Sequence, residues 1–460
     1  MPPRSPEGWI GFRGFGYSWP IAEMRKRIYI ETWGCQMNLH QSEGLAGAMR
    51  RAGHEIVDRL DRADVVLFNG CMVRQKAEEK LLGRLGAVAE EKRRRPVLLG
   101  VGGCFGQIHG SKILTRSAAV DFVFGTRGHA SLPALVDRVA AAGERLTAVD
   151  GEEDDEESVF VRSSSVSAMV TITEGCSNFC SYCIVPYARG PMRSRDPERV
   201  VDEVRRAVDD GYREVVLLGQ NVNSYGRDRP SYGTFAELLR RVARTGIDRV
   251  RFTSSHPRDL TDDVIGIMAG EPHVCRHLHL ACQSGSDRVL AAMNRGYTRA
   301  MYRELVEGAR RAIPRLNVTT DLIVGFPGES EAEFQDTLAL AEEVRFGSIY
   351  AAKYSPRPLT RAAESVDDVA SAAKEERLER LLAAQRRIAL EENQRFVGET
   401  LAVLIEGETR DRVHYGRADD HRTVVVHGAV EVGELVPVCV ERAAAAALVG
   451  VALVPEGAVS

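Results

Sequence analysis

Three cysteines in the middle of this 460-residue chain constrain its fold more than any other feature. Cys176, Cys180 and Cys183 follow an apolar run, 168–173, that is typical of a strand. Thiolates are the usual ligands of iron–sulfur clusters, and three of them can hold three irons of a four-iron cluster. The fourth iron then stays open and can chelate the amino and carboxylate groups of S-adenosylmethionine (SAM). The spacing therefore predicts a cluster that binds SAM.

A cluster with an open iron can pass an electron into the sulfonium of SAM and release a 5′-deoxyadenosyl radical, which is the cofactor's own chemistry. The C-x3-C-x-aromatic-C pattern, with Tyr182 as the aromatic residue, resembles the signature of the radical SAM superfamily. A zinc site is the alternative, but no histidine or fourth cysteine lies nearby to complete a tetrahedron. A disulfide with one spare thiol is less consistent with the compartment that the composition indicates.

The composition favours a cytoplasmic protein. The sequence contains no run of about 18 apolar residues, so we expect no membrane span. The first 23 residues lack the apolar segment of a secretory signal, and residues 1–25 are expected to be a disordered tail or a mis-assigned start. In a reducing compartment the nine cysteines are expected to be ligands or buried thiols. Because the net charge is −4, any contact with nucleic acid needs a local basic patch.

The segment 26–142 alternates short apolar strands with helical stretches, which is typical of a parallel α/β sheet. Strands are expected at 27–32, 64–68 and 96–101. A glycine-containing turn with one cysteine follows each of them: Cys35, Cys71 and Cys104, which are 36 and 33 residues apart. Because parallel strands end at one edge of a sheet, these thiols are expected to converge and hold a second cluster with an open iron. Three unrelated buried cysteines are the alternative.

The segment 162–395 repeats strand and helix six times and ends in a charged helix, expected at 374–395. Asp196-Pro197 and the pair Ser330 and Glu333 are helix start signals. Six units are too few for a closed eight-stranded barrel, so the pattern predicts a (βα)6 partial TIM barrel with its site at the carboxyl ends of the strands. Strands are expected at 168–173, 214–219, 249–253, 277–281, 317–325 and 348–354. The polar residues at these strand ends are Gln220, Asn221, Asn223, Ser254, Ser255, His256, Gln283, Ser284 and Asp321.

Two further segments complete the domain plan. Six consecutive acidic residues at 152–157 repel one another and predict a linker over 143–161. The last segment, 396–458, has short strands expected at 403–405, 423–426 and 435–440, typical of a small antiparallel β-barrel. It contains five arginines and ten acidic residues, which is unexpected for an RNA-binding module. The remaining cysteines, Cys275, Cys282 and Cys439, are expected to be core residues.

Several motifs together resemble one family, the radical SAM methylthiotransferases, over residues 26–458. The resemblance implies an amino-terminal methylthiotransferase domain (26–142), a radical SAM domain (162–395) and a carboxyl-terminal TRAM barrel (396–458). The matching stretches are Thr32–Asn38, Val101–Cys104, Glu174–Gly190, Leu217–Tyr225, Arg251–Pro257, Gln283–Ser286 and Asp321–Glu329.

The resemblance also implies the cofactors. Two [4Fe–4S] clusters are expected: Cys176, Cys180 and Cys183 would bind the cluster that cleaves SAM. The other trio, Cys35, Cys71 and Cys104, would bind an auxiliary cluster that handles the incoming sulfur. Two SAM molecules would be used per turnover, and the two clusters would face a shared cavity. The candidates for contacts with SAM are Tyr182, Gln220, Asn221, Ser255, Gln283, Ser284 and Asp321.

For substrate and partners, the resemblance implies an enzyme that replaces the C2–H of N6-isopentenyladenosine at position 37 of tRNA with a methylthio group. The target base lies in the single-stranded anticodon loop, where it can be unstacked. Arg189, Arg193 and Arg195 are candidate phosphate contacts, with a solvated turn or internal ion pairs as the alternative. We expect a monomer that needs an electron donor such as a flavodoxin or ferredoxin, and a sulfur donor that the sequence does not identify.

Other substrates stay open within the same family: threonylcarbamoyladenosine at position 37, or an aspartate of a ribosomal protein. The stretch Thr32–Asn38 favours the isopentenyl substrate. From a different class, the chain could be a non-enzymatic iron–sulfur protein that binds RNA and senses redox state. The complete three-cysteine loop and the polar strand ends argue against that alternative.

Overall fold

The computed structural model describes residues 25–151 and 160–453, which divide into two compact units. The first unit runs to Ser163 and also contains the later segment Ile184–Gly190. The second unit consists of Ser164–Cys183 and the chain from Pro191 onward. The predicted tail, apart from Arg25, and the acidic run 152–157 lie outside the described residues. The domain boundaries proposed from the sequence therefore remain predictions.

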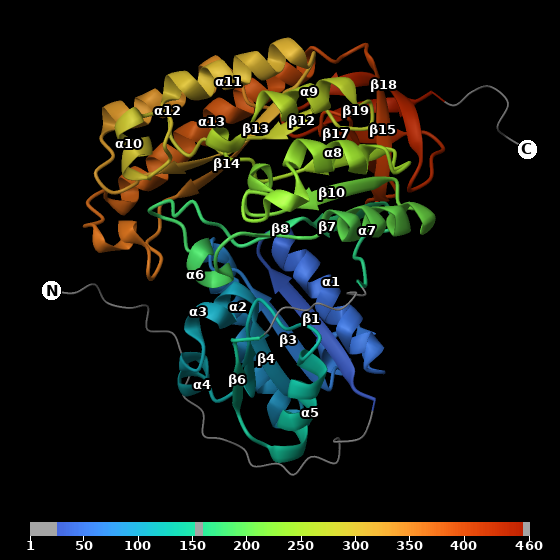
Figure 1. Ribbon diagram of the computed structural model, residues 1–460, viewed down its shortest axis with the longest axis vertical. Helices are drawn as coiled ribbons and strands as arrows, with labels where there is room; N and C mark the ends of the chain where they lie inside the picture. Colours follow the sequence, from blue (N-terminus) through green and yellow to red (C-terminus); the bar gives the residue numbers. More distant parts are fainter. Residues whose placement is uncertain (1–24, 152–159, 454–460) are drawn as a thin grey trace, which may run out of the picture. The chain divides into compact units, whose positions relative to one another are not determined.

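The first unit contains one parallel sheet of six strands, in the order β2-β1-β3-β4-β5-β6 (Figure 1). The parallel α/β sheet is confirmed, although only three of its strands were expected from the sequence. The three additional strands are short and two of them lie at the sheet edges. The strands are β1 (Arg27–Trp33), β2 (Glu55–Val57), β3 (Val65–Gly70), β4 (Leu98–Gly102), β5 (Phe122–Phe124) and β6 (Leu146–Ala148).

Helices cover both faces of this sheet, as a parallel sheet requires. On one face Leu45 and Val136 pack with Leu67, and on the other Leu81 and Phe105 pack in the cluster of Phe68. The helices are α1 (Gln36–Arg51), α2 (Gln75–Arg94), α3 (Gly103–His109), α4 (Lys112–Arg116), α5 (Leu132–Ala142) and α6 (Val185–Arg189).

The second unit contains six parallel strands arranged as two three-stranded sheets, β11-β10-β7 and β12-β13-β14. Isolated parallel bridges, Val250 with Val274 and Ser255 with Leu280, join the two sheets, so the predicted partial barrel is confirmed. The strands are β7 (Ser167–Thr171), β10 (Glu214–Leu218), β11 (Arg249–Phe252), β12 (His277–His279), β13 (Asn317–Val324) and β14 (Ser348–Lys353).

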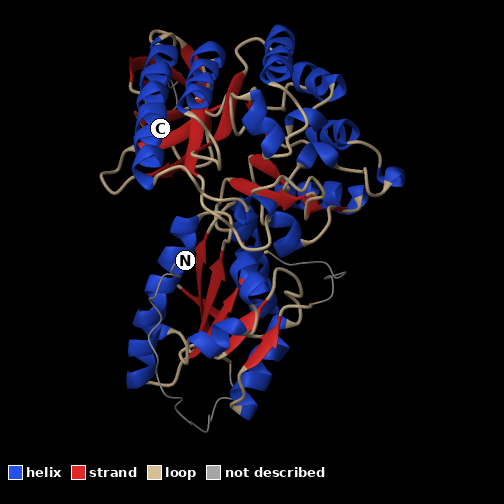
Figure 2. Ribbon diagram, turned by 90° about the vertical axis from the view of Figure 1, so that its left-hand side faces the viewer, coloured by secondary structure: helices blue, strands red, loops and turns tan. Residues whose placement is uncertain are grey.

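Helices pack against one face of these strands (Figure 2). Asp196 accepts hydrogen bonds from the N–H groups of Glu198 and Arg199, and Ser330 forms a capping box with Glu333, as the sequence predicts. A two-stranded ribbon joins β8 (Thr173–Glu174) to β9 (Arg193–Ser194). The helices are α7 (Pro197–Asp209), α8 (Phe235–Ala243), α9 (Asp262–Gly270), α10 (Asp287–Ala292), α11 (Arg299–Ala312), α12 (Glu331–Val344) and α13 (Ser371–Gln394). Among the described helices, none combines the length and the apolar character needed to cross a membrane.

The carboxyl-terminal part of the second unit is a closed five-stranded barrel in the order β15-β16-β17-β19-β18. The small β-barrel is confirmed, with two corrections. Strands β16 and β19 are not expected from the sequence, and the pairing of β17 with β19 is parallel, whereas the other pairings are antiparallel. The strands are β15 (Thr400–Glu408), β16 (His414–Ala418), β17 (Thr423–His427), β18 (Leu435–Ala443) and β19 (Leu448–Ala452).

Two buried arginines of β11 fasten the small barrel to the partial barrel. Arg249 donates to the carbonyl oxygens of Arg417 (2.5 Å) and Ala402 (2.7 Å). Arg251 donates to the carbonyl oxygen of Ala418 (2.9 Å) and pairs with Glu214 at 2.5 Å. The side chains of Arg251 and Glu214 are 3% and 2% exposed, so neither charge can be solvated by water if the other is removed.

We therefore expect Arg251→Ala to lower the free energy of unfolding by about 3–5 kcal/mol, because the substitution leaves Glu214 as an unpaired buried charge. Arg213 pairs with Asp248 at 2.9 Å with side chains 45% and 35% exposed, and it provides the control. Arg213→Ala should cost about 1 kcal/mol or less. Urea denaturation followed by circular dichroism measures both. Equal losses in the two variants would contradict the role assigned to Arg251.

Candidate active site

The cysteines of the first unit lie next to one another although they are far apart in the chain. Cys35 is the N-cap of α1, Cys71 follows β3, and Cys104 lies in the first turn of α3, after β4. Because β1, β3 and β4 are neighbours in the sheet, the three turns meet at its carboxyl edge. The approach is close: a Cβ atom on Gly34 would lie 2.6 Å from Cβ of Cys71, so only glycine fits there.

The pKa values of these thiols reflect their mutual contact. The hydrogen bond between Cys71 and Cys35 is the main cause that lowers the pKa of Cys35 to about 5. The same bond raises the pKa of Cys71, and burial raises the pKa of Cys104. Arg189, which is 6% exposed, hydrogen-bonds Cys104 and stabilises both the Cys35 and the Cys104 thiolates. Three thiols beside a fixed cation are a donor set that fits a thiolate-bound cluster.

The cysteine loop of the second unit is held by the segment that contains α10. The backbone N–H of Ser181 donates to the carbonyl oxygen of Met293 (3.0 Å), and its hydroxyl donates to that of Ala292 (2.8 Å). The amide of Asn294 donates to the carbonyl oxygen of Phe179 (3.0 Å), whose φ of 46° lies in the left-handed region. These bonds fix the loop on both sides of the second thiol, Cys180, without using the thiols themselves.

A second buried arginine lies beside this loop. Nη1 of Arg295 donates to Sγ of Cys180 at 3.3 Å, and Nη2 donates to the carbonyl oxygen of Ala281 at 2.5 Å. Nε donates to the hydroxyl of Tyr297 at 2.9 Å, so the guanidinium, 4% exposed, is held from three sides. Burial raises the pKa of Cys176. Arg295 is not among the candidates that the sequence indicates, because it lies 112 residues after Cys183 and only the tertiary fold brings it to the loop.

Within the described parts of the chain, no three His, Cys, Asp or Glu side chains are placed to share one metal ion. A four-iron cluster has a different requirement, because each thiolate binds a separate iron. Both cysteine trios are compatible with that requirement.

Several polar atoms at the strand ends are buried and lack a partner within the described residues. They are Oγ1 of Thr173, Oε1 of Gln220, Oδ1 of Asn221, both amide atoms of Asn223 and Oγ of Ser255. Buried polar atoms are normally hydrogen-bonded, so this group indicates a bound polar molecule. The amino, carboxylate and hydroxyl groups of SAM fit such a lining.

The other residues proposed for SAM are placed differently. The hydroxyl of Ser284 is fully buried and accepts a hydrogen bond from the backbone N–H of Ser286, so it faces the core. Tyr182 packs in a small apolar cluster with Met293 and Phe326, where it supports the cysteine loop. Gln283 lies at the end of this region with φ of 79°, and Asp321 accepts a hydrogen bond from Nε2 of His279.

Each of the three arginines proposed to contact phosphate makes contacts within the protein. Arg195 pairs with Glu203 at 2.9 Å and donates to the carbonyl oxygen of Thr171 at 2.6 Å. Arg189 is buried beside the thiols of the first unit. Arg193 lies 3.7 Å from Glu174. The side chains of Arg193 and Arg195 remain 23% and 32% exposed, so their contact with phosphate stays a prediction.

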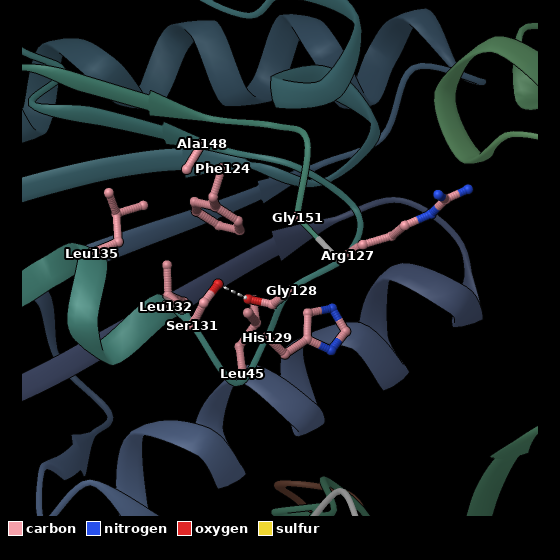
Figure 3. A pocket seen from close by; sticks show the side chains of 10 residues that line it. All are labelled: Leu45, Phe124, Arg127, Gly128, His129, Ser131, Leu132, Leu135, Ala148 and Gly151. Carbon is pink, nitrogen blue, oxygen red and sulfur yellow. Dashed lines mark hydrogen bonds between the residues drawn. The ribbon is translucent and has the colours of Figure 1, made fainter. Parts of the chain in front are cut away.

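A small pocket in the first unit is not part of either thiol site (Figure 3). It lies between α5 and the turn at Gly128, whose carbonyl oxygen accepts a hydrogen bond from the hydroxyl of Ser131 (2.8 Å). Its volume of 30 Å³ is enough for one or two water molecules and far too small for SAM or a nucleotide.

Comparison with family models divides the chain into three matches. Residues 27–125 match an uncharacterized protein family, UPF0004, residues 170–341 match the radical SAM superfamily, and residues 394–453 match the TRAM domain.

Comparison with curated proteins finds relatives along almost the whole chain. A tRNA-2-methylthio-N(6)-dimethylallyladenosine synthase of Geobacter sulfurreducens is 46% identical over 87% of this chain and 91% of its own length. The protein of the same name in Carboxydothermus hydrogenoformans is 44% identical over 90% of this chain and 96% of its own length.

Among solved structures, the radical SAM methyltransferase TsrM of Kitasatospora setae aligns with a TM-score of 0.56 at 14% identity. The alignment covers 74% of this chain and 77% of that one. The cobalamin-dependent radical enzyme OxsB aligns with a TM-score of 0.51 at 12% identity, over 80% of this chain and 56% of that one. At such low identity these likenesses show the fold alone.

The electrostatics of the first trio predict how its thiols react in the metal-free protein. Because Cys35 has a pKa of about 5, its thiolate should persist through neutral pH and be lost only as the pH falls through that value. Cys282, whose pKa burial raises to about 12, should stay protonated and unreactive. Alkylation by iodoacetamide against pH, with each site quantified by mass spectrometry, measures this.

Arg189→Met should move the Cys35 midpoint upward, because a cation that stabilises the thiolate is removed. Arg138→Met, on the outer helix α5, is the control and should leave the midpoint unchanged. A wild-type midpoint near 8.5, the value of an ordinary cysteine, would show that the trio is not assembled as described.

Proposed function

The chain belongs to the family of tRNA-2-methylthio-N(6)-dimethylallyladenosine synthases, and we propose that it catalyses the reaction for which that family is named. It replaces the C2–H of N6-isopentenyladenosine at position 37 of tRNA with a methylthio group. The observation that carries this proposal is the pair of separate three-thiol sites in one chain, at the carboxyl ends of two parallel sheets. One site could serve the cleavage of SAM, and the other could serve the delivery of sulfur.

Each thiol site would hold one [4Fe–4S] cluster. Cys176, Cys180 and Cys183 would hold the first, and Cys35, Cys71 and Cys104 the second. When bound, the clusters supply the electron that cleaves SAM and the place where the incoming sulfur is methylated, with two SAM molecules used per turnover. Radical SAM chemistry needs the first cluster in any member of the superfamily, and sulfur insertion is the reason to propose the second.

The protein's own residues bind and orient the reactants. Gln220, Asn221 and Ser255 present unpartnered oxygen atoms and would hold the polar groups of SAM, together with Gln283. Asn221 is itself fixed, because its amide donates to Oγ of Ser224 and to Oδ2 of Asp259, both at 2.5 Å. The pKa of the buried His256 falls to about 3, chiefly through burial, so this imidazole stays neutral and serves to support the site.

The substrate partner is tRNA, and the anticodon loop is the part that the site would engage, because a base must leave its stack before C2 can be reached. We also propose that the protein works as a monomer in the cytoplasm, with an electron donor such as a flavodoxin or ferredoxin and with a separate sulfur donor.

Two cysteine variants separate the proposed roles. Cys176→Ala should abolish the formation of 5′-deoxyadenosine from SAM, because its cluster loses a ligand. Cys35→Ala should retain that cleavage but stop the appearance of methylthio product. Liquid chromatography of 5′-deoxyadenosine and of digested tRNA measures both in one reaction. If Cys35→Ala abolished cleavage as fully as Cys176→Ala in a folded protein, the assignment of roles would be wrong.

Nucleoside mass spectrometry of tRNA from a strain that lacks the gene identifies the substrate. The methylthio nucleoside should disappear while its N6-isopentenyladenosine precursor accumulates, and the wild-type gene should restore it. Loss of a methylthio form of threonylcarbamoyladenosine would assign the other tRNA substrate. Unchanged tRNA would contradict the proposal and direct attention to a protein target.

A further inference from the structure

A chain of hydrogen bonds runs along β12 and β13 of the second unit and ends in a carboxylate. Nε2 of His277 lies 2.9 Å from Oγ1 of Thr319, and the same oxygen lies 3.1 Å from Nδ1 of His279. Nε2 of His279 then lies 3.2 Å from Oδ2 of Asp321. Thr319 and His279 are register partners across the two strands, which explains the direct contact.

These side chains lie on the face of the sheet that the helices do not cover. Side chains alternate along a strand, and Val318, Leu322 and Val324 of β13 belong to the core that packs against the helices. Thr319 and Asp321 therefore point to the opposite, concave face. On β14, Ile349 belongs to the same core, so Tyr350 shares the concave face with Asp321, its register partner.

One contact in this set has a fixed direction. A carboxylate only accepts, so Nε2 of His279 carries the hydrogen that Asp321 receives. Oγ1 of Thr319 lies within hydrogen-bond distance of both imidazole rings and fixes the position of His279. The bond from His279 in turn holds the carboxylate of Asp321 in one orientation.

The series of hydrogen bonds is closed by other residues at His277 and is open to solvent at Asp321. At the amino-terminal end of the strands, the ring of His277 stacks on that of His421 at 4.4 Å. Asn317 closes the same end by donating to the carbonyl oxygen of Asp420 (2.7 Å). At the open end, the side chain of Asp321 is 35% exposed and Tyr350 is 45% exposed. Nε2 of His279 donates to Oδ2 of Asp321, and none of the described residues donates to Oδ1 of the same carboxylate.

We propose that Asp321 and Tyr350 recognise the purine base of the substrate: Oδ1 of Asp321 accepts the N6–H of the base while the ring of Tyr350 stacks on it. A singly substituted exocyclic amine keeps one N–H, and a carboxylate fixed by His279 can only accept. A half-exposed tyrosine ring next to it, edge-on to His279 at 5.6 Å, provides the stacking surface. The inference rests on the proposed function, and it assigns Asp321 to the binding of the substrate instead of SAM.

The test uses two synthetic anticodon stem-loops that differ in one atom. One carries N6-isopentenyladenosine at position 37, and the other carries the 6-isopentenyloxy analogue, in which oxygen replaces N6–H. The reconstituted wild-type enzyme should prefer the N–H substrate by about 10- to 100-fold in kcat/KM, the range expected for a hydrogen bond to a charged group. Asp321→Ala should reduce this preference to about one.

Binding measurements keep the test independent of turnover. Fluorescence anisotropy of the same two stem-loops should show the same preference in the wild-type protein and its loss in Asp321→Ala. Thr319→Val, which breaks the series of hydrogen bonds but keeps the carboxylate, should weaken the preference partially.

Tyr350→Ala should raise KM for both stem-loops about tenfold, and Tyr350→Phe, which keeps the ring, should not.

Asp336 is the matched control, because it is an aspartate on the helix-covered side, 3.5 Å from Arg299, with 52% of its side chain exposed. Asp336→Ala should keep the wild-type preference. A wild-type enzyme that methylthiolates both stem-loops equally, or an Asp321→Ala variant that keeps the preference, would overturn the inference. A wild-type enzyme that methylthiolates neither would instead contradict the proposed function.

Discussion

The structure depends on one constraint, namely that neighbouring parallel strands end at the same edge of a sheet. In the first unit this brings together Cys35, Cys71 and Cys104, which separate βα segments deliver to adjacent turns. In the second unit it gathers the polar atoms that follow β7, β10 and β11. The helices between the strands pack on the sheets, and the resulting hydrophobic core stabilises this convergence. The candidate site is therefore a consequence of topology more than of any single loop.

Buried arginines lie beside the negatively charged or ionisable groups in both units. Arg189 lies beside the thiols of the first unit, and Arg295 donates to Cys180 in the second. A buried cation is costly unless a negative group accompanies it, and thiolates are such groups. The same logic fixes the small barrel, where Arg251 is buried against Glu214. Each of these arginines is therefore held in one position by the group with which it is paired.

Much of this arrangement can be predicted from the sequence, and the features that cannot be predicted have physical reasons. The spacing of Cys176, Cys180 and Cys183 and the recurrence of one cysteine per βα unit are local patterns, so they could be read directly. Short strands such as β2 and β5, of three residues each, carry no periodicity to detect. The sequence shows the charge of Arg195 but not its ion pair with the buried Glu203. The chain from His277 to Asp321 joins residues about forty positions apart through tertiary contacts alone.

The proposed reaction requires that one chain holds two clusters, each on its own trio of thiolates. Iron and sulfide analysis of the anaerobically reconstituted protein, together with its Mössbauer spectrum, tests this most directly. We expect about eight irons per chain, all in [4Fe–4S] clusters. A limit of about four irons per chain at saturation would contradict it, because one trio would then be without a cluster.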